Sequence, residues 1–215
     1  MDDNLKLDRL PAMNIQPALA VSVRPRNRLN TRTFDVLCIL GGSVLIAVLA
    51  QVRIDLGFTP VPITGQTLGV LLVGALLGSK RGSAAVIAYL LEGAAGLPVF
   101  AGGMTGAAYM AGPTGGYLLG FIATAFVVGL LAERGWCRRI DTAALALAFG
   151  LSLTLLCGWV WLSILLGPRP AIAAGVLPFL PGGGFKIALA CLLLPAGDRL
   201  LRTLRPDQSD DDGSS

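Results

Sequence analysis

The residue with the most specific chemistry in this sequence is a lysine in an apolar stretch. Lys186 lies near the start of the last apolar run, about one turn into an expected helix, and the chain contains no histidine. An ionisable side chain within a membrane span is costly and is by default a functional hypothesis. No carboxylate in the apolar runs is an evident partner, so we expect Lys186 to bind a ligand carboxylate. The alternative is that Lys186 snorkels to the outer interface.

A polar segment, 58–68, carries hydrogen-bonding side chains between two apolar runs. Pro60 and Pro62 favour an extended backbone in it. The segment is either a plain rigid connection or a lid over a pocket that faces outward, and we favour the lid. Its candidate ligand-binding side chains are Thr64 and Gln66, with Thr59 and Thr67 nearby.

Glycine-rich sequence at 93–116 interrupts the apolar runs. Irregular backbone at membrane depth is tolerated only where protein buries it or where it lines a cavity. The aromatic residues in and around this segment are candidates for the walls of a pocket, or for an interface belt. They are Tyr89, Phe100, Tyr109 and Tyr117.

The composition excludes most soluble classes. The chain has 215 residues, of which 54% are hydrophobic and only 14% charged, and its mean hydropathy is +0.71. An average soluble domain carries about 25% charged residues. The four cysteines show no metal-ligand spacing, no phosphate loop is present, and no nucleophile and base stand together. We therefore expect neither an enzyme nor a cofactor, and no nucleic-acid partner.

The apolar runs predict an all-α integral membrane protein with six transmembrane helices. With both termini cytoplasmic, fourteen of the 17 Lys and Arg residues fall inside and only Arg53 and Arg169 outside, as the positive-inside rule requires. The predicted division is a cytoplasmic tail at 1–33, a six-helix membrane domain at 34–204 and a disordered acidic tail at 205–215. The expected helices cover 34–52, 67–77, 82–91, 117–132, 143–166 and 182–204, the last kinked at Pro195.

Small residues on the first expected helix form a flat face. This helix carries Gly41, Gly42, Ser43, Ala47 and Ala50, in which Ser43 and Ala47 are four residues apart and Ala47 and Ala50 are three apart. Such a spacing of small residues lets another helix approach closely, and the candidates for partner contact are Gly42, Ser43 and Ala47. This face either meets a partner protein or packs inside the chain. We predict partner binding.

Three motifs, in this order along the chain, resemble the BioY family. They are Pro60-Val-Pro-Ile-Thr-Gly-Gln-Thr-Leu68, Gly96-Leu-Pro-Val-Phe-Ala-Gly-Gly103 and Gly112-Pro-Thr-Gly-Gly-Tyr-Leu-Leu-Gly-Phe121. The resemblance implies a multi-pass protein of the cell membrane, surrounded by lipid, that captures biotin from outside. It also implies that the first outer loop helps to close the pocket. The implied partners are the transmembrane coupling protein of an energy-coupling factor (ECF) transporter, met by small residues of helix one, and a pair of ATP-binding cassette (ABC) ATPases.

The resemblance extends to a fourth segment with one departure. Residues 178–186 are similar to the family pattern Pro-Phe-x-Pro-Gly-Asp-x-x-Lys, but Gly183 stands where the family has aspartate. The resemblance implies that the family's lysine and aspartate both belong to the biotin site. Lys186 can take the role of the lysine, but Gly183 cannot take that of the aspartate. Glu92 is the nearest acidic substitute in the outward segments.

The resulting hypothesis assigns a role to each group of biotin. Lys186 binds the carboxylate, Thr64 and Gln66 bind the polar atoms, and Tyr89, Phe100 and Tyr117 wall the rings. The alternatives are a family subunit for another small carboxylate vitamin and a stand-alone secondary transporter. A small channel and an intramembrane enzyme have less support.

Overall fold

The computed structural model describes residues 28–203, which form an almost entirely helical bundle. Most of the two predicted tails lies outside the described residues, although the first helix already begins at Arg28 rather than at residue 34. In chain order the elements are α2 (Arg28–Ala50), β1 (Arg53–Ile54), β2 (Ile63–Thr64), α3 (Gln66–Ala94), the 3-10 turn η1 (Ala101–Gly103), α4 (Ala107–Ala111), α5 (Gly115–Glu133), the 3-10 turn η2 (Trp136–Arg138), α6 (Ile140–Leu166), α7 (Pro168–Gly175) and α8 (Phe179–Thr203).

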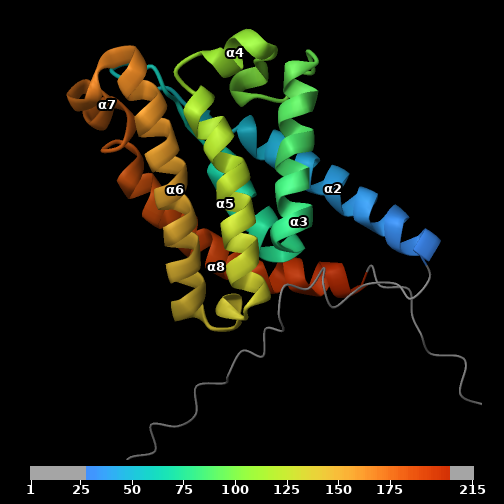
Figure 1. The fold of residues 1–215 in the computed structure, drawn as a ribbon. Helices are drawn as coiled ribbons and strands as arrows, with labels where there is room; N and C mark the ends of the chain where they lie inside the picture. The colour runs from blue at the N-terminus through green and yellow to red at the C-terminus, as the bar shows by residue number, and fades with distance from the viewer. Residues whose placement is uncertain (1–27, 204–215) are drawn as a thin grey trace, which may run out of the picture.

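Five helices within the described range are long and apolar enough to cross a membrane, namely α2, α3, α5, α6 and α8. In Figure 1 α3, α5 and α6 stand side by side, and α5 packs against both neighbours. The spans of α3 and α5 are 67% and 61% buried, but those of α2 and α8 only 28% and 17%. Many of the large apolar side chains on α2 and α8 are exposed, among them Leu37, Val48 and Leu192, as expected for helices in contact with lipid.

Helix α3 is folded back on itself at Gly78, where the backbone has φ 82° and ψ 179°. Only glycine adopts this conformation readily. A Cβ placed on Gly82 would lie 3.0 Å from the Cα of Gly74, whereas these residues would be about 12 Å apart in a straight helix. The two short helices predicted around a basic turn are thus the two halves of α3. Counted this way the described chain has six long helical segments, and their six membrane crossings remain a prediction.

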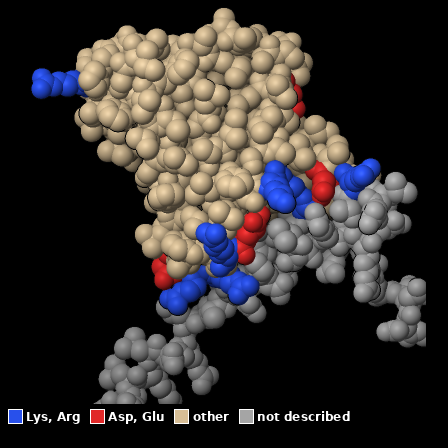
Figure 2. Space-filling view, in the orientation of Figure 1, with Lys and Arg blue, Asp and Glu red and all other residues tan. Residues whose placement is uncertain are grey.

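Charged side chains gather at one end of the bundle, the lower end in Figure 2. There the Arg81 guanidinium lies 2.5 Å from Asp35 and joins α3 to α2. Glu133 at the end of α5 accepts hydrogen bonds from the backbone N–H and the hydroxyl of Ser79, at 2.7 and 2.9 Å. This end contains the turn at Gly78 and matches the side predicted to be cytoplasmic.

The last helix begins earlier than predicted. Helix α8 starts at Phe179 instead of Gly182, so that Lys186 lies two turns into the helix rather than one. Pro195, the predicted kink, is inside α8. Beyond it α8 passes below the turn of α3, where a Cβ on Gly197 would lie 2.6 Å from Leu76.

The small-residue face of α2 is covered by this chain itself, which corrects the partner-binding prediction. A Cβ on Gly42 would lie 2.9 Å from the Cβ of Ala85 in α3. Ser43 is fully buried and donates a hydrogen bond of 2.5 Å to Glu92, also in α3. Ala47 is partly buried and packs against the same core cluster. The small residues permit the close approach of α2 to α3, and the outward face of α2 is formed by Gly41, Val44 and Val48.

Candidate functional site

A cavity lies at the end of the bundle opposite the charged one, between α3, α5, α6 and α8. The β1–β2 segment and α4 cover it. It measures about 30 Å³, which is close to the share of liquid volume of one water molecule. Its lining comprises Val61, Pro62, Thr64, Gln66, Thr67, Tyr109, Thr114, Tyr117, Leu118, Phe121, Leu151, Thr154, Leu155, Phe179 and Lys186.

Lys186 is the one charged residue in this lining. The ion pairs among the described residues join Arg53 to Asp55, Arg81 to Asp35 and Arg139 to Asp141, and Lys186 takes part in none of them. A cation in a mostly apolar wall is favoured when an anion neutralises it. The structure thus puts Lys186 where the sequence analysis expected it, at a cavity and without a protein carboxylate as partner.

Thr64 and Gln66 also line the cavity, at the point where β2 leads into α3. The hydroxyl of Thr64 donates to Gln66 Oε1 at 3.0 Å, and Gln66 Nε2 donates to the hydroxyl of Tyr89 at 2.5 Å. Both predicted polar residues are therefore buried, mutually oriented and adjacent to the cavity.

Tyr117 is the predicted aromatic wall that does line the cavity. Its hydroxyl donates to the backbone oxygen of Gly175 at 2.6 Å, which fixes the ring. The ring lies 5.9 Å from that of Phe179, at the start of α8. These two rings form an apolar face, and Tyr109 adds a third aromatic side chain to the lining.

Tyr89 and Phe100 do not line the cavity, which corrects their predicted role as walls. Both are fully buried in the core cluster around α2, α3 and α5. The Phe100 ring packs edge-on to Tyr89 at 5.6 Å and stacks on Tyr109 at 5.2 Å. Gly93 makes this possible, because a Cβ there would lie 2.1 Å from the Phe100 ring. Phe100 and Tyr89 thus support the lining from behind.

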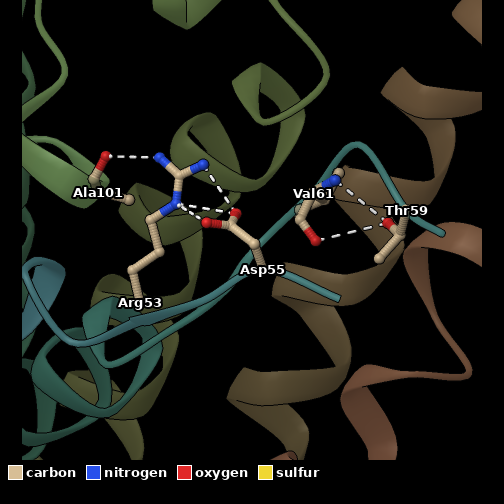
Figure 3. A network of polar contacts seen from close by, with 5 residues as sticks. All are labelled: Arg53, Asp55, Thr59, Val61 and Ala101. Atoms are coloured by element: carbon tan, nitrogen blue, oxygen red, sulfur yellow. Dashed lines mark hydrogen bonds and ion pairs between the residues drawn. The ribbon is translucent and has the colours of Figure 1, made fainter. Parts of the chain in front are cut away.

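The segment between α2 and α3 crosses the outer end of the cavity as a short antiparallel hairpin, with Arg53 opposite Thr64. Figure 3 shows the Arg53 side chain pointing away from the hairpin, between the carboxylate of Asp55 and the backbone oxygen of Ala101. The hydrogen bonds with Asp55 raise the pKa of Arg53. In the loop between β1 and β2 the Thr59 hydroxyl donates to the backbone oxygen of Ala174 in α7 at 2.7 Å. The segment is thus attached at two points, to η1 through Arg53 and to α7 through Thr59, and its role as a lid stays a prediction.

A second hollow of about 320 Å³ lies outside the first. The two share Pro62, Tyr109 and Thr114, which therefore form the partition between them. Burial raises the pKa of Tyr109, and a hydrogen bond with Thr114 opposes the shift. Lys186 belongs to the lining of the inner cavity alone.

At the position of the family aspartate the structure shows an apolar contact. A Cβ on Gly183 would lie 2.5 Å from Leu151 Cδ2, so the space of a side chain at 183 is taken by a leucine that also lines the cavity. Glu92 does not replace the aspartate. It is outside the lining and its carboxylate accepts the hydrogen bond of Ser43.

Thr154 is the functional candidate that the sequence analysis missed. It is 2% exposed, lines the cavity from α6, and lies 2.7 Å from the hydroxyl of Thr124 in α5. Other hydroxyls in α6, those of Ser152 and Ser163, donate to the backbone one turn earlier, a common arrangement in helices. In the sequence Thr154, Ser152 and Ser163 are equivalent, because each is a hydroxyl residue within an apolar run. Only the packing of α5 against α6 shows that Thr154 faces the cavity and Thr124.

The comparison with known proteins agrees with these features. Residues 22–203 match the BioY family. This chain belongs to the BioY family. A biotin transporter BioY of Rhizobium etli is 39% identical over 166 residues, covering 74% of this chain and 89% of the relative. A biotin transporter BioY of Thermotoga maritima is 42% identical over 155 residues, covering 70% and 88%.

A solved structure extends the agreement to the fold. The crystal structure of the S-component for biotin from an ECF-type ABC transporter superposes with a TM-score of 0.70, at 30% sequence identity. The match covers 83% of this chain and 95% of that one. This BioY family member is therefore an all-α, multi-pass membrane protein of the S-component fold, and its family consists of transporters rather than enzymes.

Proposed function

We propose that this chain is the substrate-binding subunit that captures biotin from outside the cell for uptake. The observation that carries the proposal is the position of Lys186, the one cation in an apolar and aromatic cavity beneath the outer hairpin. The curated relatives that bear the name biotin transporter provide the identity of the ligand.

The cavity offers one group for each part of biotin. The Lys186 ammonium binds the carboxylate, the rings of Tyr117 and Phe179 contact the apolar thiophane ring, and Thr64 with Gln66 binds polar atoms of the ureido ring. Pockets of this type combine apolar walls with a few directed polar groups.

Ligand entry requires the outer segment to move. A cavity of about 30 Å³ is far smaller than the hundreds of Å³ of typical ligand pockets. The contacts of Arg53 with Ala101 and of Thr59 with Ala174 hold the segment closed. Opening it joins the cavity to the outer hollow across Pro62, and binding energy then favours closure over the ligand.

Energy for uphill transport comes from other subunits in this proposal. The sequence contains no phosphate loop, so ATP hydrolysis falls to a pair of ABC ATPases joined through a transmembrane coupling protein. The complex resides in the cell membrane, with the charged end of this chain in the cytoplasm.

Titration of the purified protein with biotin tests the proposal, with Lys186→Ala as the decisive variant. We expect saturable binding by the wild type and a loss of about tenfold to a hundredfold in affinity on removing the charged hydrogen bond. Arg169→Ala is the matched control, since Arg169 is basic, exposed and on the outer side but outside the lining. Equal affinity for biotin in Lys186→Ala and the wild type would contradict this site.

A second ligand deserves testing because Leu151 fills the place of the family aspartate. A more apolar wall favours a small carboxylate vitamin with fewer polar atoms than biotin. Binding of such a carboxylate together with no detectable binding of biotin would favour this alternative.

A further inference from the structure

Two hydrogen-bond chains end at hydroxyl groups in the cavity wall, and each chain fixes the direction of the hydroxyl proton. The inference drawn from them rests on the proposed function and concerns which ligand atoms the cavity selects. The first chain runs from the backbone oxygen of Val99 through Tyr89 and Gln66 to Thr64.

Counting protons along the first chain orients every group in it. Tyr89 donates its single hydroxyl proton to the oxygen of Val99, 3.1 Å away, because a carbonyl oxygen can only accept. Tyr89 must then accept from the amide nitrogen of Gln66, which turns the amide oxygen toward Thr64. Thr64 donates its only proton to that oxygen. What Thr64 has left for a ligand is lone pairs.

The second chain gives the same result for a lining residue of α6. Thr124 donates its proton to the backbone oxygen of Gly150 at 3.0 Å. The hydrogen bond of 2.7 Å between Thr124 and Thr154 is therefore donated by Thr154. Thr154 lines the cavity and, like Thr64, has only lone pairs left.

We infer that Thr64 and Thr154 act as obligate hydrogen-bond acceptors, and that they select a ligand head group bearing N–H donors, such as a cyclic urea. A carboxylate at the position of the family aspartate could supply such acceptors, but that position is Gly183 here. The two threonines provide neutral acceptors instead. Tyr89 and Thr124 are positioning residues, because each keeps the proton of a lining threonine away from the cavity.

The test compares two ligands that differ in one donor. They are biotin and its cyclic carbamate analogue, in which a ring oxygen replaces one ureido N–H, so that an acceptor faces an acceptor at nearly unchanged size. We expect the wild type to prefer biotin by about tenfold to a hundredfold, because a missing donor leaves a buried acceptor unpaired. Thr154→Val should lower the affinity for biotin by a similar factor.

The positioning residues are tested by the ratio of the two affinities. Thr124→Val frees the proton of Thr154, and Tyr89→Phe frees the amide of Gln66 to turn over, so each should reduce the preference for biotin by about tenfold. A purely structural role would weaken both ligands equally and leave the ratio unchanged. Ser152→Ala, an exposed hydroxyl on α6, is the control and should keep the wild-type ratio.

The outcomes separate the inference from the proposed function. Equal affinity of the wild type for biotin and for the carbamate overturns the inference, and this result does not depend on whether any variant folds. It does not contradict the proposed function, since biotin is still bound. Unchanged ratios in both Thr124→Val and Tyr89→Phe overturn the positioning roles. Wild-type protein that binds neither ligand overturns the proposed function itself.

Discussion

Lys186 and its surroundings determine which ligands the cavity can accept. The side chain lies two turns into α8, beside aromatic rings and threonine hydroxyls, with no carboxylate of the described chain as ion-pair partner. A carboxylate ligand would supply the missing charge. Next to Gly183, one turn before Lys186 in α8, the lining side chain is the apolar Leu151.

Restoring the aspartate should therefore require space as well as charge. Gly183→Asp alone forces Leu151 aside, and we expect it to lower stability by about 1–3 kcal/mol, the usual cost of overpacking. The double variant Gly183→Asp/Leu151→Ala should lose less stability than the sum of the losses of the two single variants, because the alanine leaves room for the aspartate. Thermal unfolding in detergent and biotin titration of the two single variants and the double variant form a double-mutant cycle. Additive effects on stability would show that the two positions do not compete for space.

The sequence predicts a cavity residue correctly where its type is rare in the surrounding segment. Lys186 is the only Lys or Arg that the charge count assigns neither to the cytoplasmic nor to the outer side. Thr64 and Gln66 follow Pro60 and Pro62, which disfavour a regular helix in that segment. Tyr89 and Phe100 were predicted as pocket walls but lie in the core, because an aromatic residue in the sequence does not reveal which way its side chain points. Their burial depends on the missing side chain of Gly93, a contact between helix and loop that no local pattern indicates. Thr154 escaped notice because its partner, Thr124, is 30 residues away.

At the scale of elements, α2 has two different faces that the sequence pattern does not separate. Gly42 and Ser43 face α3, and Gly41, one residue earlier, has no atom within 4 Å of the place where its Cβ would be. The predicted small-residue face therefore serves the packing of this chain. A partner helix would instead meet the outward face that contains Gly41.

Adjacent glycines provide a matched pair to test this assignment. Gly42→Val should destabilise the isolated protein by about 1–3 kcal/mol because its side chain meets Ala85. Gly41→Val should leave the unfolding temperature unchanged, yet reduce the amount of coupling subunit that co-purifies. Measuring both properties on both variants separates the two faces. Normal co-purification with Gly41→Val would place the partner elsewhere.

At the scale of the whole molecule, the two ends of the bundle differ in charge. The end with the Gly78 turn carries Arg81, Glu133 and the basic residues after α5, whereas the cavity and its covering hairpin occupy the other end. The charge count along the sequence anticipated this polarity. The apolar runs also anticipated the two halves of α3, although not that Gly78 would be the residue at which the chain turns.

Accessibility of single cysteines tests the orientation. With the four native cysteines replaced by alanine, Arg169→Cys should react with a membrane-impermeant maleimide on intact cells. Arg138→Cys should react only after the cells are made permeable. Both positions are basic, and they lie on opposite predicted sides. Labelling of Arg138→Cys on intact cells would reverse the proposed topology.

The fold in α3 also has a consequence for how the protein enters the membrane. The halves, 66–77 and 79–94, are about 18 and 24 Å long, and each falls short of the hydrocarbon core of about 30 Å. Neither half is a good insertion signal alone, so the two should partition into the bilayer together as one helical hairpin. The Ser79 N–H at its tip gains the carboxylate of Glu133 only after 54 further residues have been synthesised. The hydrogen bond at the tip of the hairpin therefore forms only when α5 packs against α3, after the hairpin itself has inserted.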